Sequence, residues 1–117
     1  MINLERFKEI ELKTAKVLEA EKVKGSEKLL KLQVEMGSEK RQIIAGIGLK
    51  YQPQDLIGKI IIIVANLEPK KFRIRQGEGE EFEELESQGM LLAASDPQKG
   101  PVLLTTDEEV DSGLGIS

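Results

Sequence analysis

Residues 59–66 constrain the fold of this chain more than any other segment. They read KIIIIVAN, a run of six apolar residues of which five are β-branched. β-Branched side chains favour strands, and six apolar residues fall far short of the ~20 that span a bilayer as a helix. We therefore predict a strand that is buried on both faces and crosses the centre of the core.

Alternating hydrophobicity predicts further strands on both sides of that run. Residues 30–36 place an apolar side chain at every second position, so one face of this strand should be buried and the other solvated. A long strand over residues 12–23 has one break in its alternation, which indicates a β-bulge. Residues 41–45 follow a short turn and complete a hairpin with residues 30–36, and residues 90–94 form the fifth strand.

Two short helical turns are also predicted. Asn3 is a suitable cap for a helix that begins at Leu4. Pro53 at a first helical turn and Gly58 just past its end indicate one turn between the third and fourth strands. Five main strands, with a long loop before the fifth, predict an all-β fold: a five-stranded, closed or partly closed barrel of OB type. A flat two-layer sandwich is the alternative.

The composition excludes several classes of function. The 117 residues include no Cys and no His, which excludes a zinc finger, a disulfide framework, a thiolate nucleophile and an imidazole base. The hydroxyl of Ser87 therefore has no base that would activate it, and we expect no catalytic residues and no cofactor. The glutamates of residues 78–84 match no known metal-binding loop, so we expect a mobile acidic loop tip there and no metal site.

The start of the chain is charged within five residues and has no apolar signal-peptide core. We expect a cytoplasmic, soluble protein with no membrane association. The length predicts a single domain.

The formal net charge of -4 hides an asymmetry along the chain. Residues 1–75 hold 16 of the 17 basic side chains against 10 acids, whereas residues 76–117 hold Lys99 alone against 11 acids. An acidic protein is a poor candidate for nucleic-acid binding, but an electric field depends on where charges lie in space. A solvated surface whose acids happen to fall late in the chain is the simpler alternative.

Residues 70–75 read KKFRIR and place four cations within six positions, on the loop expected after the central strand. In an extended segment, alternation would direct Lys71, Arg73 and Arg75 to one side and Phe72 and Ile74 to the other. Such a patch can neutralise several phosphates of a nucleic acid. A solubilising loop, or a hinge paired with the glutamates that follow, is the alternative.

Four stretches, taken in order, resemble one known family: GSEKLLKL at 25–32, IAGI at 44–47, VANLEPKKFR at 64–73 and ESQGMLLAASD at 86–96. Over about residues 4–116 the chain is similar to the structure-specific tRNA-binding domain, an OB-fold module. Members occur as free-standing homodimers, at the C-terminus of methionyl-tRNA synthetases, near the N-terminus of bacterial phenylalanyl-tRNA synthetase β chains and in an endothelial-monocyte-activating-polypeptide-like cytokine. The resemblance implies a barrel that binds the outside corner of tRNA without reading the anticodon. It would thereby assist an aminoacyl-tRNA synthetase, the methionyl type first, in cis or in trans.

The resemblance also implies site residues, position by position. Asn66, Lys71, Arg73, Ser87 and Met90 match the residues expected at or beside the RNA surface, although Asn66 is equally suited to a strand-end cap and Met90 to the core. Together with the family-matched Lys28 and the remaining cations of residues 70–75, the expected tRNA-binding residues are Lys28, Asn66, Lys70, Lys71, Arg73, Arg75, Ser87 and Met90.

The sequence departs from the family pattern at one place. The link between the Arg-Gly and Ser-x-Gly-Met motifs is stretched by about ten residues, over 74–85, and carries five glutamates. Arg75 with Gly77 is a rival to Arg73 for the family arginine. We expect one domain over 1–117, with the barrel at about 11–95. The acidic insertion has three possible effects: it would weaken RNA binding, fold away from the basic patch, or cover the patch when RNA is absent.

Dimerisation is a further implication of the resemblance. In free-standing relatives the segment after the barrel packs two copies around a two-fold axis, and residues 97–117 are the equivalent here. The competing interpretation is a homodimeric export-chaperone-like protein, which would bind unfolded peptides on apolar surface.

Overall fold

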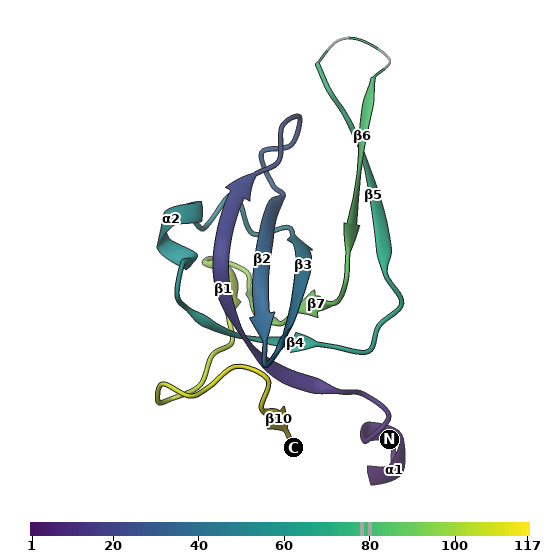
Figure 1. Cartoon of the computed structure of the whole chain (residues 1–117), viewed down its shortest axis with the longest axis vertical. Coiled ribbons are helices and arrows are strands. Elements are labelled where there is room, and N and C mark those ends of the chain that lie inside the picture. Colours follow the sequence, from purple (N-terminus) through teal and green to yellow (C-terminus); the bar gives the residue numbers. More distant parts are fainter. Residues whose placement is uncertain (78, 80) are drawn as a thin grey trace.

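One curled sheet holds most of the strands in the computed structural model, which describes residues 1–77, 79 and 81–117. The strand order is β3-β2-β1-β4-β7, and β10 pairs with β1. The curl leaves a partly closed barrel in Figure 1, which confirms the predicted all-β fold of OB type. The strands of this sheet are β1 (Leu12–Lys22), β2 (Leu30–Met36), β3 (Glu39–Ala45), β4 (Ile60–Val64), β7 (Met90–Leu91) and β10 (Gly115–Ile116).

A bulge bends β1 and lets it pair with two different strands. Its first half pairs antiparallel with β4, from Leu12 opposite Val64 to Lys16 opposite Ile60. Its second half pairs with β2, and the register shifts between Val17 and Glu19. The break in alternation therefore predicted the bulge correctly, and an extra residue at that point increases the local twist that curls the sheet.

The central strand is β4, as the β-branched run predicted. Residues 61–64 are buried and Ile60 is half-buried, because β4 lies between β1 and β7. The inward-facing side chains of β1, β2, β3 and β4 join the short helix α2 (Pro53–Leu56) in one core, whose fully buried members include Leu30, Leu32, Ile43, Leu56, Ile61 and Ile63. Fully burying one such side chain stabilises the fold by about 1.5–3 kcal/mol.

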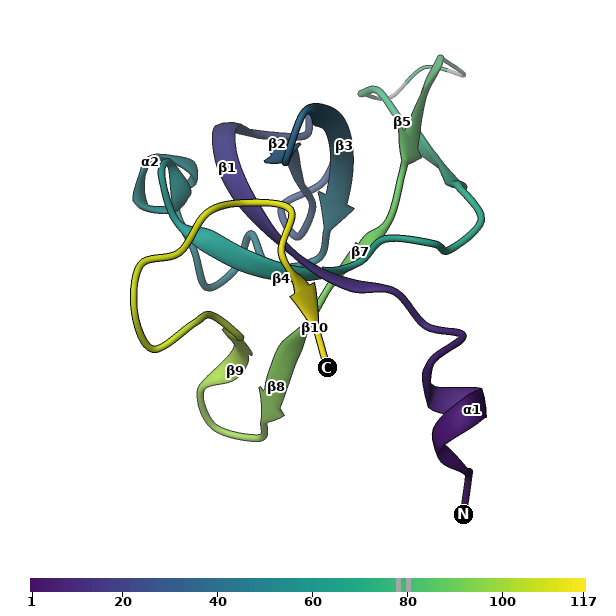
Figure 2. The same ribbon diagram turned by 60° about the horizontal axis from the view of Figure 1, so that its bottom comes forward.

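Both predicted helical turns are present. In α1 (Leu4–Phe7) the Asn3 Oδ1 atom accepts a hydrogen bond of 2.9 Å from the Arg6 N–H. Pro53 occupies the first turn of α2. Whereas α2 packs on the core, α1 projects from the barrel near the N-terminus in Figure 2.

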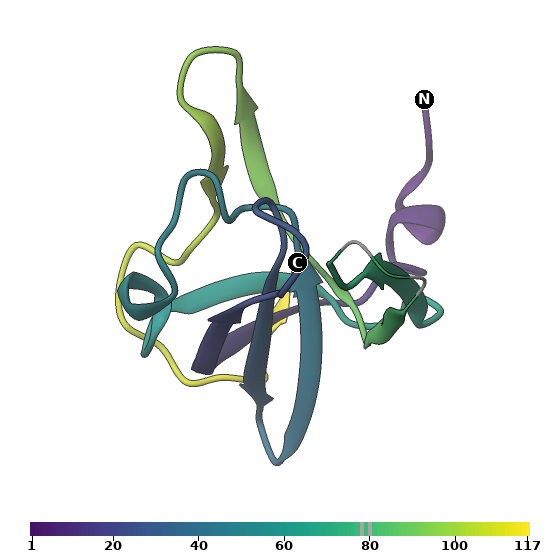
Figure 3. The same cartoon turned by 90° about the horizontal axis from the view of Figure 1, so that it is seen from above.

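Two hairpins extend from the main sheet, and Figure 3 shows that they leave it in different directions. The strands β5 (Lys70–Arg75) and β6 (Phe82–Ser87) form one, and β8 (Ala93–Asp96) and β9 (Gly100–Leu103) form the other. The prediction that residues 70–75 lie on a loop was wrong, because β5 and β6 pair in register from Lys70 opposite Ser87 to Arg75 opposite Phe82. Residues 82–84 of the expected acidic loop tip also belong to a strand. Residues 90–94 also differ from the prediction of one strand: β7 ends at Leu91 and β8 begins at Ala93.

Hydrogen bonds between β3 and residues 87–88, at the end of β6, close this side of the barrel. Gln88 N–H donates to the Gln42 carbonyl oxygen at 2.7 Å, and Gln42 N–H donates to Gln88 Oε1 at 3.0 Å. The Ser87 hydroxyl accepts from Ile44 N–H at 2.9 Å and donates to the Gly89 carbonyl oxygen at 2.9 Å. With 4% of its surface exposed, Ser87 is a buried polar link between β3 and β7.

The segment after β9 returns along the barrel to the start of β1. Thr14 is its anchor: the Thr14 carbonyl oxygen accepts from Gly113 N–H at 2.7 Å, and Thr14 Oγ1 accepts from Leu114 N–H at 2.9 Å. Pairing of Leu12 with Ile116 then forms β10. The C-terminal segment is thus attached to its own barrel.

Removing the Ser87 hydroxyl should destabilise the barrel. We expect Ser87→Ala to lower the free energy of unfolding by about 1–3 kcal/mol, because it leaves the buried Ile44 N–H without its acceptor. Chemical denaturation measures this loss. Ser95→Ala, at an exposed position in β8, is the control and should change stability by less than about 0.5 kcal/mol. Equal effects of the two substitutions would contradict the closing role of Ser87.

Candidate nucleic-acid interface

The exposed face of the β5–β6 hairpin carries a basic stripe, which we define as Lys71, Arg73 and Arg75. All three side chains are exposed, whereas Phe72 is half-buried and Ile74 is buried. This confirms the alternation predicted for residues 71–75. Figure 1 shows the hairpin rising away from the main sheet, so the stripe lies on a projecting arm.

The opposite face of the hairpin packs on the barrel. Ile74 and Leu85 join Val23 and Ile44 in a second hydrophobic cluster, with Leu29 and Phe72 at its edge. The loop after β1 lies directly against β5, since a Cβ atom on Gly25 would clash with the Arg75 carbonyl oxygen. These contacts fix the direction in which the basic stripe points.

Glutamates of β6 lie in register with the cations of the basic stripe. Glu86 is opposite Lys71 and Glu84 is opposite Arg73. Lys71 Nζ forms an ion pair of 3.5 Å with Glu84 Oε1, and both side chains are more than half exposed. Part of the acidic insertion thus lies beside the basic stripe. Glu78 and Glu80, which the sequence placed at the acidic tip, lie outside the described residues.

Lys28 and Lys70 are two further cations near the edge of the second hydrophobic cluster, next to Leu29 and Phe72 respectively. Lys28 is exposed in the loop between β1 and β2, and its stem covers Gly46, where a Cβ atom would come within 2.9 Å of Lys28 Cε. Lys70 Nζ is 4.8 Å from the centre of the Phe72 ring. Both ammonium groups are therefore on surfaces that adjoin the hairpin.

An apolar groove of about 440 Å³ lies beside the base of the hairpin. Met90 is 49% exposed there, so the interpretation of Met90 as a core residue was wrong. Ser87 reaches the groove but uses its hydroxyl within the barrel, so any contribution it makes to binding is through positioning. The lining residues are Ile44, Leu67, Glu68, Lys70, Phe72, Ser87, Gly89 and Met90.

Asn66 holds the segment that connects α1 to β1. Its Oδ1 atom accepts from Glu11 N–H at 2.9 Å, and its Nδ2 group donates to the Glu9 carbonyl oxygen at 2.7 Å. Both ends of the amide are thus occupied by backbone 55 and 57 residues away. The side chain positions the N-terminal segment next to the β4 end of the barrel.

Arg41 is a positioning residue that the sequence did not reveal. Its Nη1 group donates to the carbonyl oxygens of Ala65 and Gln88, so it joins the ends of β3, β4 and β6. A single arginine near the start of a strand carries no pattern that predicts such a contact.

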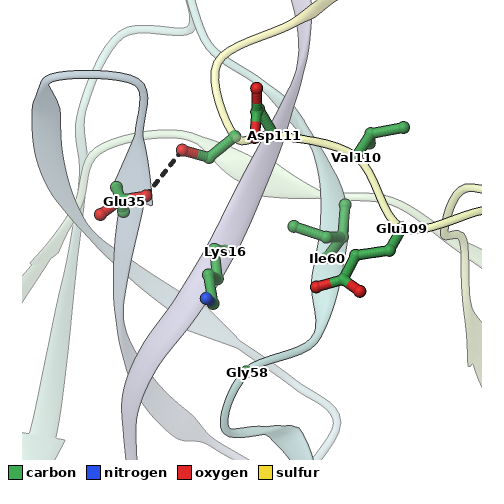
Figure 4. Close-up of a pocket in the computed structure, with 8 residues that line it drawn as sticks. Lys16, Glu35, Gly58, Ile60, Glu109, Val110 and Asp111 are labelled. Atoms are coloured by element: carbon green, nitrogen blue, oxygen red, sulfur yellow. Dashed lines mark hydrogen bonds between the residues drawn. The ribbon is translucent and has the colours of Figure 1, made fainter.

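A second hollow, of about 370 Å³, lies under the C-terminal segment and has the opposite charge character. Glu35, Glu109 and Asp111 line it together with Lys16. Figure 4 shows the hydrogen bond of 2.9 Å that Ser112 donates to Glu35 at one side. Its three carboxylates make it unsuitable for a polyanion, and within residues 1–77, 79 and 81–117 no cluster of acids has the form of a metal site.

Two residues outside the basic stripe have shifted pKa values. A hydrogen bond to Glu21 raises the pKa of Lys31, desolvation opposes this effect, and the charges of Glu21 and Glu83 add to it. Backbone N–H groups of Lys99 and Gln98 lower the pKa of Asp96 in the β8–β9 turn. The charge of Glu83 thus acts on Lys31 in β2.

Comparison with known proteins identifies one family. The model of the family described as "Putative tRNA binding domain" matches residues 12–114. The chain is 48% identical over 116 residues to the methionine–tRNA ligase of Caldanaerobacter subterraneus subsp. tengcongensis, which covers 99% of this chain but 16% of that protein. The chain thus spans about a sixth of the length of this relative.

Two solved structures are similar over the whole chain. A MetRS-related protein from Pyrococcus horikoshii has a TM-score of 0.84 and 37% identity, covering 100% of this chain and 98% of the other. The chaperone CsaA from Bacillus anthracis str. Ames has a TM-score of 0.82 and 29% identity, covering 100% and 99%. In the part of the chain that the structure describes, the helices are all too short or too polar to cross a membrane.

Proposed function

Because the chain belongs to the tRNA-binding domain family, we propose that it binds tRNA through the exposed face of the β5–β6 hairpin, by shape and phosphate contacts rather than by reading a sequence. The observation that carries the proposal is the basic stripe. Lys71, Arg73 and Arg75 extend along one exposed edge strand, so they can follow a phosphate backbone. Lys28 and Lys70 extend the cationic surface toward the barrel.

The apolar groove lies at the base of the hairpin on the side that faces the barrel, and it gives Met90 a role in the same proposal. Met90 and Leu67 are 49% and 46% exposed, and Lys70 lies at the groove with them. Apolar side chains at the edge of a basic surface suit contact with sugar and base edges of folded RNA. Asn66 and Ser87 contribute by holding the strands that present this surface.

The role we propose is accessory and non-catalytic. The methionine–tRNA ligase relative is about six times as long as this chain, so the aligned region is one part of that enzyme. A domain that binds tRNA raises the local concentration of substrate for a synthetase, in cis or in trans. Such a protein would work in the cytoplasm.

We also propose that two copies associate through α1 and β10. Leu4 is 65% exposed and Leu114 is 46% exposed, and a hollow of about 330 Å³ between α1 and β10 is lined by Phe7 and Ile116. Apolar side chains in this position have little to bury within one barrel. A two-fold pairing of this surface would combine two hairpins in one RNA-binding particle.

A second candidate function follows from the resemblance to CsaA, whose name describes a chaperone. The apolar groove would then hold an extended peptide. This function would be favoured if the affinity for a reduced, unfolded polypeptide did not change with salt concentration. Absence of tRNA binding at low salt would exclude the tRNA-binding function.

Charge reversal in the basic stripe tests the tRNA proposal. The Lys71→Glu/Arg73→Glu variant should bind tRNA about tenfold or more weakly at low salt. It should also lose up to about 1.8 from the slope of log K against log salt, because each phosphate contact contributes about 0.9. Lys50→Glu/Lys59→Glu carries the same charge change and is the control. These two residues flank α2 in sequence, and Figure 1 shows α2 away from the β5–β6 hairpin. Equal losses in both variants would show general attraction rather than a site.

Neutralising the β6 glutamates should strengthen tRNA binding. Glu84→Gln/Glu86→Gln removes two carboxylates that lie in register with the cations, and exposed ion pairs are worth about 0.2–1 kcal/mol. We therefore expect a two- to fivefold gain in affinity and a steeper salt slope. Glu108→Gln/Glu109→Gln makes the same charge change in the C-terminal segment. If the control variant gained as much affinity for tRNA, the glutamates of β6 would act only through the net charge of the protein.

Substitution of the exposed leucines tests the dimer. The mass of the intact protein, measured by light scattering, should correspond to two chains, and Leu4→Glu/Leu114→Glu should yield monomers with unchanged circular dichroism. Leu49→Glu, at a position that is 77% exposed in the loop before α2, should remain dimeric. A monomeric wild-type protein at micromolar concentration would contradict this part of the proposal.

A further inference from the structure

An exposed aromatic side chain lies on the face of the hairpin that carries the basic stripe. Phe82 begins β6 directly opposite Arg75, and 41% of its surface is exposed. Alternation along β6 directs Leu85 into the second hydrophobic cluster and Phe82 to the outer face. Phe82 therefore takes no part in the packing of the hairpin on the barrel.

Two guanidinium groups lie over the Phe82 ring. The Arg73 Cζ atom is 4.3 Å from the ring centre, and the Arg75 Cζ atom is 5.6 Å from it. Arginine is attracted to the face of an aromatic ring at such distances. Phe82, Arg73 and Arg75 thus form a small platform, which we call the stacking cluster.

The neighbours of this platform distinguish between possible ligands. Lys71 follows along the same face, so cations flank the ring on the side that continues toward the barrel. A nucleotide combines a flat base with a negative phosphate, which matches an aromatic ring between cations. A neutral, extended peptide finds a better apolar surface in the groove of Leu67, Phe72 and Met90.

We propose that Phe82 stacks on an unpaired base of the bound RNA while Arg73 and Arg75 hold the adjacent phosphates. This inference rests on the proposed function, and it adds a contact that the match to the family motifs does not supply, because Phe82 lies in the 74–85 insertion. The hairpin then contributes a salt-independent stacking contact in addition to its electrostatic contacts.

Three substitutions of Phe82 test stacking against simple apolar contact. Phe82→Ala and Phe82→Leu should each weaken tRNA binding by about five- to 150-fold, as the stacking of one base on an aromatic ring implies. The slope of log K against log salt should equal that of the wild type. Phe82→Trp should retain the affinity, and all three variants should bind a blunt 12-base-pair RNA duplex as the wild type does.

The absence of tryptophan from the 117 residues supplies a direct readout. Phe82→Trp creates a protein with one tryptophan, whose fluorescence a stacked base should quench when tRNA is added. Leu49→Trp places the single tryptophan at an exposed position in the loop before α2 and should show no quenching. Circular dichroism of each variant checks that the barrel is folded.

The outcomes separate this inference from the proposed function. If the wild type binds tRNA but Phe82→Ala binds equally well, or Phe82→Trp shows no quenching, the stacking contact is refuted and tRNA binding stands. Full affinity of Phe82→Leu would refute stacking in favour of apolar contact. Loss of unfolded-polypeptide binding in the Phe82 variants, with tRNA binding unchanged, would assign the cluster to peptides and overturn the inference. Failure of the wild type to bind tRNA at low salt refutes the proposed function itself.

Discussion

The bend in β1 is the constraint on which the rest of the structure depends. One strand has to pair with β4 through its first half and with β2 through its second half. A straight strand would keep both neighbours in one flat sheet, whereas the bulge between Val17 and Glu19 turns them toward each other. The curl brings β3 close to the end of β6, where the hydroxyl of Ser87 and the amides of Gln42 and Gln88 link the two segments.

Closure of the barrel also decides where the basic stripe points. Ser87 is both the last residue of β6 and the buried link to Ile44, so the hairpin is anchored at its base. Ile74 and Leu85 then hold the inner face on the barrel. Because side chains alternate in a strand, anchoring one face fixes the other face outward. The same apolar contacts that stabilise the hairpin therefore expose its cations.

The sequence predicted the elements whose stability comes from their own pattern. The alternation of residues 30–36, the β-branched run before Asn66 and the proline of α2 all confer local preferences that the tertiary structure reinforces. The alternation of cations and apolar residues over 70–75 predicted which side chains face outward, although it did not predict a strand.

The elements that escaped prediction depend on partners distant in sequence. β6 reads FEELES, in which three glutamates give a poor strand propensity. It forms a strand because all six of its residues pair with β5 and because Leu85 packs in the second hydrophobic cluster. The contacts of Asn66 with Glu9 and Glu11, and those of Arg41 with Ala65, likewise require the folded barrel. A motif shows that such residues matter, but it does not distinguish a ligand contact from a positioning contact.

The register of the hairpin changes how an acidic protein attracts a polyanion. Side chains directly opposite each other in antiparallel strands lie about 5 Å apart, which is less than the Debye length of about 8 Å at physiological salt. At greater distances Glu84 and Glu86 therefore cancel the charge of two of the three cations of the basic stripe, which weakens long-range attraction. At contact, each cation can approach its own phosphate while the carboxylates turn to solvent. Under the function that we propose, recognition would depend on how closely the RNA follows the hairpin, and the glutamates of β6 would favour a ligand of matching shape over any dense negative charge.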